Sequence, residues 1–199
     1  IITEIGGSVG DIESLPFIEA VRQVKWDLGA NNAMVIHLTL IPYLSAAKEL
    51  KTKPTQHSVK ELLAEGIQPD ILVCRTEYPL PNEIRKKLAL FCNVNINSVI
   101  EAMDAETIYD VPLLMRKEKL DERVLSRLKV PSRQEPDLDD WKTFLGKLKN
   151  PVEEVTLVTM LCNNTGITIG TLDVSPKELF YKYVKVKDEK EIIKKVVEV

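Results

Sequence analysis

Short apolar, β-branched runs alternate with helical periodicity over about the first 110 residues, and this alternation constrains the fold more than any other feature of the sequence. Strands buried in a parallel sheet are nearly continuous apolar runs, whereas the helices between them repeat apolar residues every three to four positions. The pattern predicts an α/β fold, a doubly wound parallel sheet with helices on both faces. The expected strands are 1–5, 34–41, 71–74 and 99–100, and the run 34–41 is apolar enough to be covered on both faces.

Helices are expected between these strands and after them. The first should run from about Asp11 to Leu28, with a proline near its start and Gly29 at its end. Ser58 and Glu61 have the spacing of a capping box, which predicts the start of the next helix. The remaining predicted helices are one opened by Asn82, one over 113–128 and a short one around 141–148.

The composition excludes several classes of partner. With 27 basic and 30 acidic residues, the chain has no general field for nucleic acid or an anionic membrane, so any anion site must be a local cluster. Three cysteines without paired spacing argue against a disulfide framework, and Cys74, inside an apolar run, is expected to be a buried structural thiol. No stretch approaches membrane-spanning length and no signal peptide is recognised, so we expect a cytoplasmic protein.

The segment 48–56 is the most informative candidate site. Lys51 and Lys53 are two residues apart and would point the same way if the segment were extended, and Thr52, Thr55 and Gln56 add neutral donors beside them. Such a set can clamp a triphosphate, although a solvated surface loop has the same composition.

The glycine-rich turn 6–10 is a weaker candidate. It follows the first predicted strand, so its backbone N–H groups could approach a phosphate, but a tight strand-to-helix turn is the commoner explanation. Glu4, Asp11 and Glu13 surround this turn and could hold magnesium, or Asp11 could cap the helix. His37 lies in an apolar strand, where a satisfied core histidine is expected, and two histidines without clustered cysteines support neither zinc nor a Cys-His nucleophile.

Several longer strings resemble one known family. The strings 4–17, 51–59, 66–72 and 88–94, followed by 108–109 with 111–112, are similar to those of CTP synthases in order and spacing, over about residues 1–157. The resemblance implies a P-loop-NTPase-like, dethiobiotin-synthetase-like fold. It implies an amidoligase domain over 1–130, followed by a linker with a short helix over 131–150 and an unassigned tail over 151–199.

The resemblance also implies a reaction and its site residues. ATP, with Mg²⁺, would phosphorylate O4 of UTP, and ammonia obtained from glutamine would displace that phosphate to give CTP, which is also a feedback inhibitor. The assembly would be a homotetramer, with filaments as a further form. No catalytic residue is assigned. The implied binding residues are Asp11, Ile12, Glu13, Lys51, Thr52, Lys53, Pro54, Thr55, Gln56, Lys87 and Phe91 for UTP/CTP, Met103, Asp104 and Ala105 for ATP, and Glu4 for the metal.

The chain also departs from the family pattern. The family's P-loop segment and its glutaminase domain, with a Gly-x-Cys-x-Gly string, are missing from these 199 residues, and residue 1 already lies in a predicted strand. We therefore expect a fragment that is inactive alone. The alternative is a non-catalytic UTP/CTP-binding module with a regulatory or assembly role.

Overall fold

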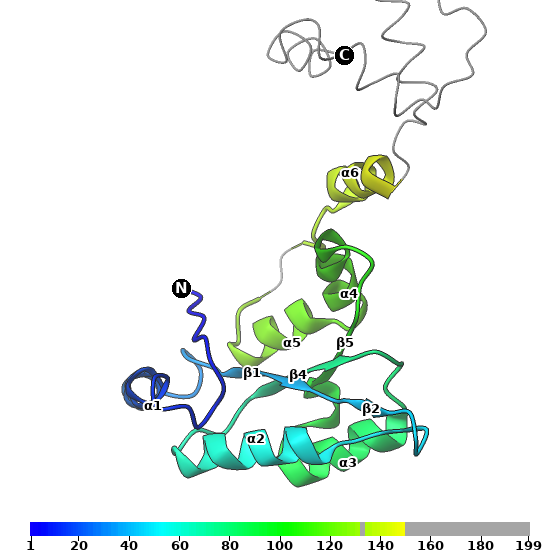
Figure 1. Cartoon of the computed structure of the whole chain (residues 1–199). Coiled ribbons are helices and arrows are strands. Elements are labelled where there is room, and N and C mark those ends of the chain that lie inside the picture. The colour runs from blue at the N-terminus through cyan, green and yellow to red at the C-terminus, as the bar shows by residue number, and fades with distance from the viewer. Residues whose placement is uncertain (132–133, 150–199) are drawn as a thin grey trace, which may run out of the picture. The chain divides into compact units, whose positions relative to one another are not determined.

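The computed structural model describes residues 1–131 and 134–149 (Figure 1). The chain divides into two compact units, residues 1–136 and residues 137–199. Of the second unit, helix α6 (Asp139–Lys149) is described, and it confirms the short helix predicted around 141–148. The unassigned tail over 151–199 lies outside the described residues, and Cys162 lies in it.

Parallel strands form the centre of the first unit. Among the described residues, the sheet has the order β1-β4-β5, and both neighbouring pairs are parallel. Val73 in the central strand is in register with Leu38 on one side and with Ile100 on the other. The predicted parallel sheet is therefore confirmed. Its strands are β1 (Ile36–Leu40), β4 (Ile71–Thr76) and β5 (Val99–Met103).

Helices cover both faces of the two strands β4 and β5, as Figure 1 shows. On one face Leu72 of β4 packs in a cluster with Val59 and Leu88, and on the other Val73 packs with Met115 and Val124. Side chains alternate between the faces of a strand, so one apolar run supplies both clusters. The first face is covered by α2 (Lys53–Ala64) and α3 (Asn82–Cys92), the second by α4 (Val111–Lys117) and α5 (Leu120–Arg127).

Strand β1 does not fit the prediction of a strand covered on both faces. His37 and Thr39 are buried, whereas Ile36, Leu38 and Leu40 are exposed, with Leu38 at 67%. The helices α4 and α5 contribute to the apolar cluster over β4 and β5, and no residue of β1 belongs to that cluster. An apolar run therefore predicted the strand correctly but not what covers it.

The predicted strand over 1–5 is also wrong. These residues form no strand, and Ile1 is fully exposed. A strand needs a neighbour for its backbone hydrogen bonds, and the segment pairs with no other described strand. Helix α1 (Leu15–Leu28) begins later than Asp11, because the Asp11 carboxylate accepts a hydrogen bond from the Ser8 N–H and closes a turn first. Gly29 ends the helix as predicted.

Two further helix boundaries differ from the prediction. Helix α2 begins at Lys53, with Pro54 in its first turn, so Ser58 lies inside the helix and does not cap it. The hydroxyl of Ser58 is instead 2.9 Å from Nε2 of the buried His37, which confirms the predicted core histidine. The helix predicted over 113–128 is two helices, because Lys119 adopts a left-handed conformation (φ 60°) between them.

Burial favours the uncharged forms of three groups in the core. Burial lowers the pKa of His37. It raises the pKa of the Cys74 thiol to about 11, in spite of a hydrogen bond from Thr39, and this confirms Cys74 as a structural thiol. Cys92 is equally buried, and its pKa is likewise raised to about 11. Within the described ranges, no helix is both long enough and apolar enough to cross a membrane.

One carboxylate joins three parts of the first unit. Asp70, with its side chain 10% exposed, accepts hydrogen bonds from Lys25 Nζ on α1 and from the Val35 N–H before β1, each at 2.8 Å. Its second oxygen accepts one from Arg127 Nε on α5, also at 2.8 Å. Because an ionised carboxylate accepts strong hydrogen bonds, Asp70 fastens α1 and α5 to the segment that leads into β1.

Candidate functional site

A hollow lined by lysines lies beyond the carboxyl end of β1. Its volume is about 500 Å³. Two separate stretches of chain form it, one that connects β1 to α2 and one on α3. We call it the lysine hollow, and its lining residues are Pro42, Glu49, Leu50, Lys51, Thr52, Lys53, Pro54 and Lys87.

A small hairpin shapes the first stretch. Strands β2 (Tyr43–Leu44) and β3 (Glu49–Leu50) pair antiparallel, and the Lys51 N–H donates to the Pro42 carbonyl at 2.9 Å. The chain then turns directly into α2 at Lys53. Free backbone N–H groups at the start of a helix favour an anion, so the lysines stand beside a second source of positive potential.

The two lysines meet in the hollow for a different reason than the predicted one. An extended segment would place them on one side, but Thr52 has helical dihedral angles (φ −87°, ψ −13°) as the residue that precedes α2. Lys51 ends the hairpin and Lys53 opens the helix. The condition of an extended segment is therefore not met, although both lysines line the same hollow.

Glu49 brings a negative charge into the lysine hollow. Its carboxylate accepts a hydrogen bond from Lys51 Nζ. This hydrogen bond and the charge of Lys51 lower the pKa of Glu49, and the charge of Lys87 lowers it further. In this structure Glu49 is therefore paired with Lys51, while the described contacts include no ion pair of Lys53 or Lys87 with a carboxylate.

Thr55 and Gln56 do not line the hollow. The Thr55 hydroxyl is fully buried and donates to the Leu40 carbonyl at 3.1 Å, which fastens α2 to β1. The Gln56 amide donates at 3.0 Å to the hydroxyl of Thr52, the residue that precedes the helix. Here these side chains hold the backbone that carries the lysines, and their predicted contact with a nucleotide stays a prediction.

Phe91 and the residues Asp11–Glu13 also lie outside the hollow. Phe91 follows Lys87 by one helical turn on α3 and is 61% exposed. Asp11, Ile12 and Glu13 belong to the exposed turn before α1, where Gly7 and Gly10 have positive φ angles of 84° and 96°. Backbone conformation therefore accounts for these two glycines, and a role of the turn in binding phosphate stays a prediction.

The predicted ATP segment follows β5. Met103 is the last residue of the strand, and the Asp104 N–H donates to the Thr76 carbonyl at the end of β4. The Asp104 carboxylate accepts from Arg75 Nε at 2.9 Å. Arg75 was missed by sequence reasoning, although it is the one charged residue of the run 71–76. The segment thus lies at the carboxyl ends of two adjacent strands, where ligands of such sheets bind.

An aromatic pair after β1 and β4 was also missed. The rings of Tyr43 and Tyr78 have centroids 4.2 Å apart and are inclined by 40°. Each tyrosine comes shortly after the end of a strand, which is the signal that could have drawn attention to it.

The described residues do not make a magnesium site by themselves. Within residues 1–131 and 134–149, no group of three His, Cys, Asp or Glu side chains could hold a metal ion. Glu4 can offer one carboxylate, and magnesium is usually held by one or two carboxylates together with phosphates and water. Its role as a ligand stays a prediction.

Parallel strands, helices on both faces and a lysine hollow beyond the strand ends define an α/β protein with a candidate anion site at the edge of its sheet. A family model described as the CTP synthase N-terminus matches residues 1–130. The chain belongs to the CTP synthase family.

Individual relatives agree with this assignment. A CTP synthase of Cytophaga hutchinsonii is 76% identical over 157 residues, which are 79% of this chain and 29% of that protein. One of Methanocaldococcus jannaschii is 61% identical over 156 residues, 78% of this chain and 29% of that protein. One of Bacteroides fragilis is 59% identical over 157 residues, with coverages of 79% and 29%. The chain thus spans about 29% of the length of these relatives.

Proposed function

We propose that this chain carries the triphosphate-binding part of the UTP/CTP site of a CTP synthase. The observation that supports this most is the meeting of Lys51 and Lys53 with Lys87, which lies 34 residues further along the chain than Lys53. Three ammonium groups around one hollow match three consecutive phosphates better than they match a solvated loop. The start of α2 adds backbone N–H groups that favour the same charge.

Binding of the nucleotide would change the contacts within the lysine hollow. Lys51 must exchange the Glu49 carboxylate for a phosphate, whereas Lys53 and Lys87 can bind without losing a carboxylate. An exposed ion pair such as Glu49–Lys51 is worth little in water, so a triphosphate can displace it.

In the proposed reaction, ATP phosphorylates O4 of UTP and ammonia, supplied from glutamine, replaces that phosphate to give CTP. Phosphoryl transfer depends mostly on positioning and on stabilisation of charge. The residues of this chain would hold the UTP triphosphate in the lysine hollow, and Met103, Asp104 and Ala105 would contact the adenine of ATP. Magnesium would supply charge neutralisation when bound, with Glu4 as one ligand.

The remaining parts of the proposal concern regulation and assembly. As a feedback inhibitor, CTP would compete with UTP for the same lysines. Asp11, Ile12 and Glu13 would contact the cytosine base of CTP. The functional unit would be a homotetramer in the cytoplasm. A site that binds UTP and CTP without turnover would favour the alternative, a non-catalytic regulatory or assembly module.

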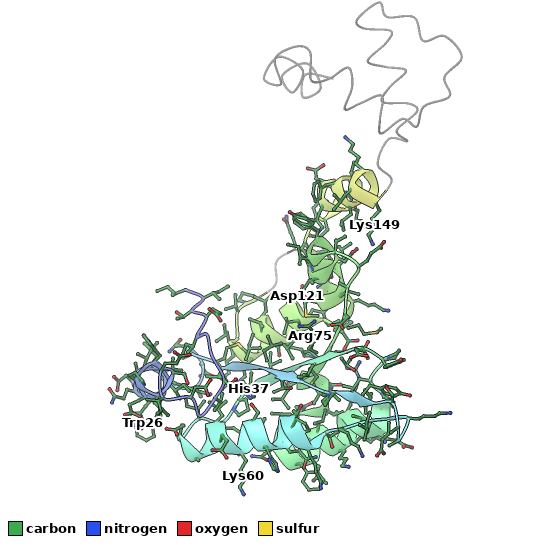
Figure 2. All side chains as sticks on the ribbon, viewed as in Figure 1. Trp26, His37, Lys60, Arg75, Asp121 and Lys149 are labelled. Atoms are coloured by element: carbon green, nitrogen blue, oxygen red, sulfur yellow. The ribbon has the colours of Figure 1, made fainter. Side chains whose placement is uncertain are left out.

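Calorimetric titration of UTP and CTP into the 199-residue chain tests this proposal. We expect Lys53→Ala to weaken both nucleotides at least tenfold, which is about 1.4 kcal/mol. Lys60→Ala is the matched control, because Lys60 is an exposed lysine on the same helix that points away from the sheet (Figure 2). Equal affinities of the two variants would refute the proposed site.

A further inference from the structure

Arg85 on α3 is bonded to four places in the first unit. Its Nε donates to the Leu80 carbonyl at 3.3 Å, and its Nη1 donates to the Val99 carbonyl at 2.9 Å and to the Glu118 carboxylate at 2.6 Å. Its Nη2 donates to the Glu101 carboxylate at 3.3 Å. The guanidinium therefore connects three parts of the unit: the loop before α3, strand β5 at Val99 and Glu101, and the corner between α4 and α5.

The two glutamates are themselves fixed to the backbone. Glu118 accepts the N–H of Glu101 at 3.1 Å, and Glu101 accepts the N–H of Leu80 at 2.5 Å. The side chains of Arg85, Glu101 and Glu118 are between 17% and 20% exposed. Although burial alone would raise the pKa of Glu118, hydrogen bonds from Arg85 and from the Glu101 N–H keep it lowered. The network is thus charged and largely shielded from water.

Arg85 and Lys87 lie on opposite sides of the same helix. Two residues correspond to about 200° of rotation at 3.6 residues per turn. Arg85 shares its side of α3 with the fully buried Leu88 and Cys92, whereas Lys87 faces the lysine hollow. Burial of leucine and cysteine sets which side of α3 faces the sheet, but apolar contacts are not directional and leave small rotations of the helix open. The guanidinium of Arg85, with its fork of N–H donors, makes four directional hydrogen bonds. These hydrogen bonds restrain the rotation of the helix about its axis.

We propose that Arg85 is a positioning residue for the triphosphate site, because its fork fixes the rotation of α3 and so aims Lys87 at the lysine hollow. This role rests on the proposed function of that hollow. Lysine cannot replace Arg85 here, since its three donors radiate from one atom and cannot satisfy four separate acceptors. Loss of the fork leaves Lys87 charged and present but no longer held toward Lys51 and Lys53.

A double-mutant cycle tests this role. The affinity for UTP is measured by calorimetry on the 199-residue chain, on Arg85→Lys, on Lys87→Ala and on the double variant, with circular dichroism as the check on folding. We expect Lys87→Ala to weaken UTP at least tenfold and Arg85→Lys to weaken it about fivefold, within the range of coupled neighbours. In the Lys87→Ala background, Arg85→Lys should change the affinity less than about twofold.

Arg127→Lys is the matched control for stability. It breaks a comparable guanidinium–carboxylate contact, with Asp70, away from the hollow, and should lower Tm without changing the affinity for UTP. If Arg85→Lys does not fold, Glu118→Ala replaces it, since it removes the acceptor that orients Nη1 and should weaken UTP in the same Lys87-dependent way.

The outcomes separate this inference from the proposed function. An equal loss in both backgrounds overturns the positioning role, because Arg85 would then act independently of Lys87. A strong effect of Lys87→Ala with none of Arg85→Lys overturns the positioning role and leaves the site standing. Unchanged UTP affinity in Lys87→Ala, or no UTP binding by the unmodified chain, overturns the proposed site and the role of Arg85 together.

Discussion

Replacement of Asp70 by asparagine should destabilise the first unit more than any single surface change. The carboxylate, 10% exposed, is the common partner of Lys25, Arg127 and the Val35 N–H. Asparagine keeps one acceptor oxygen, which can still receive the backbone N–H. Its amide NH2 would then replace the oxygen that faces Arg127, and both Arg127 and Lys25 would lose their counter-charge.

The magnitude follows from the burial of the three side chains. Removal of one member of a fully buried ion pair costs about 3–5 kcal/mol. The side chains of Lys25 and Arg127 are 20% and 30% exposed, so the cations can recover part of their hydration. We therefore expect Asp70→Asn to reduce the free energy of unfolding by about 2–3 kcal/mol.

Urea unfolding followed by circular dichroism measures this change. Asp27→Asn, the same replacement at an exposed position of α1, is the control and should stay within about 0.5 kcal/mol of the unmodified chain. The m-value should stay constant, since the exposed surface on unfolding is unchanged. A loss below about 1 kcal/mol for Asp70→Asn would refute the reasoning, because the network would then contribute no more than a surface pair.

Two further predictions concern the core. Burial lowers the pKa of His37, so the unfolded chain binds the proton first. Stability should be full above the unfolded value of 6.5 and fall below it, and urea unfolding at pH 7.5 and 5.5 should show a smaller difference for His37→Gln. The thiols of Cys74 and Cys92, with pKa values of about 11, should react with a thiol reagent only on unfolding. Rapid native labelling, mapped by mass spectrometry, would contradict this.

The sequence alone predicted those helices and strands that depend on residues close together in the chain. The run 71–74 is apolar throughout, and α3 begins at Asn82 with Leu88 on its inner face, as the periodicity predicted. The segment 1–5 has strand propensity but no partner among the described strands, and pairing depends on distant residues. The capping box at Ser58 failed because the helix begins earlier, at Lys53, and His37 is the partner of the Ser58 hydroxyl.

The candidate site was less accessible to sequence reasoning. The spacing of Lys51 and Lys53 placed them on one side only for an extended segment, which the structure does not have, and only the family resemblance added Lys87. The network around Arg85 has no local signal, since Glu118 follows 33 residues later and meets it through the packing of α3 against β5. Such contacts depend on tertiary structure, which a single sequence does not display.

The affinity for UTP of Lys87→Ala against that of Lys86→Ala tests the central claim most directly. The two lysines are adjacent and exposed on α3, and Lys87 lines the lysine hollow whereas Lys86 does not. One calorimetric titration per variant suffices, at fixed salt and magnesium. We predict that Lys87→Ala weakens UTP at least tenfold, about 1.4 kcal/mol, and that Lys86→Ala leaves it within about twofold. Equal losses in both variants would show a general effect of charge and would contradict a triphosphate site in this hollow.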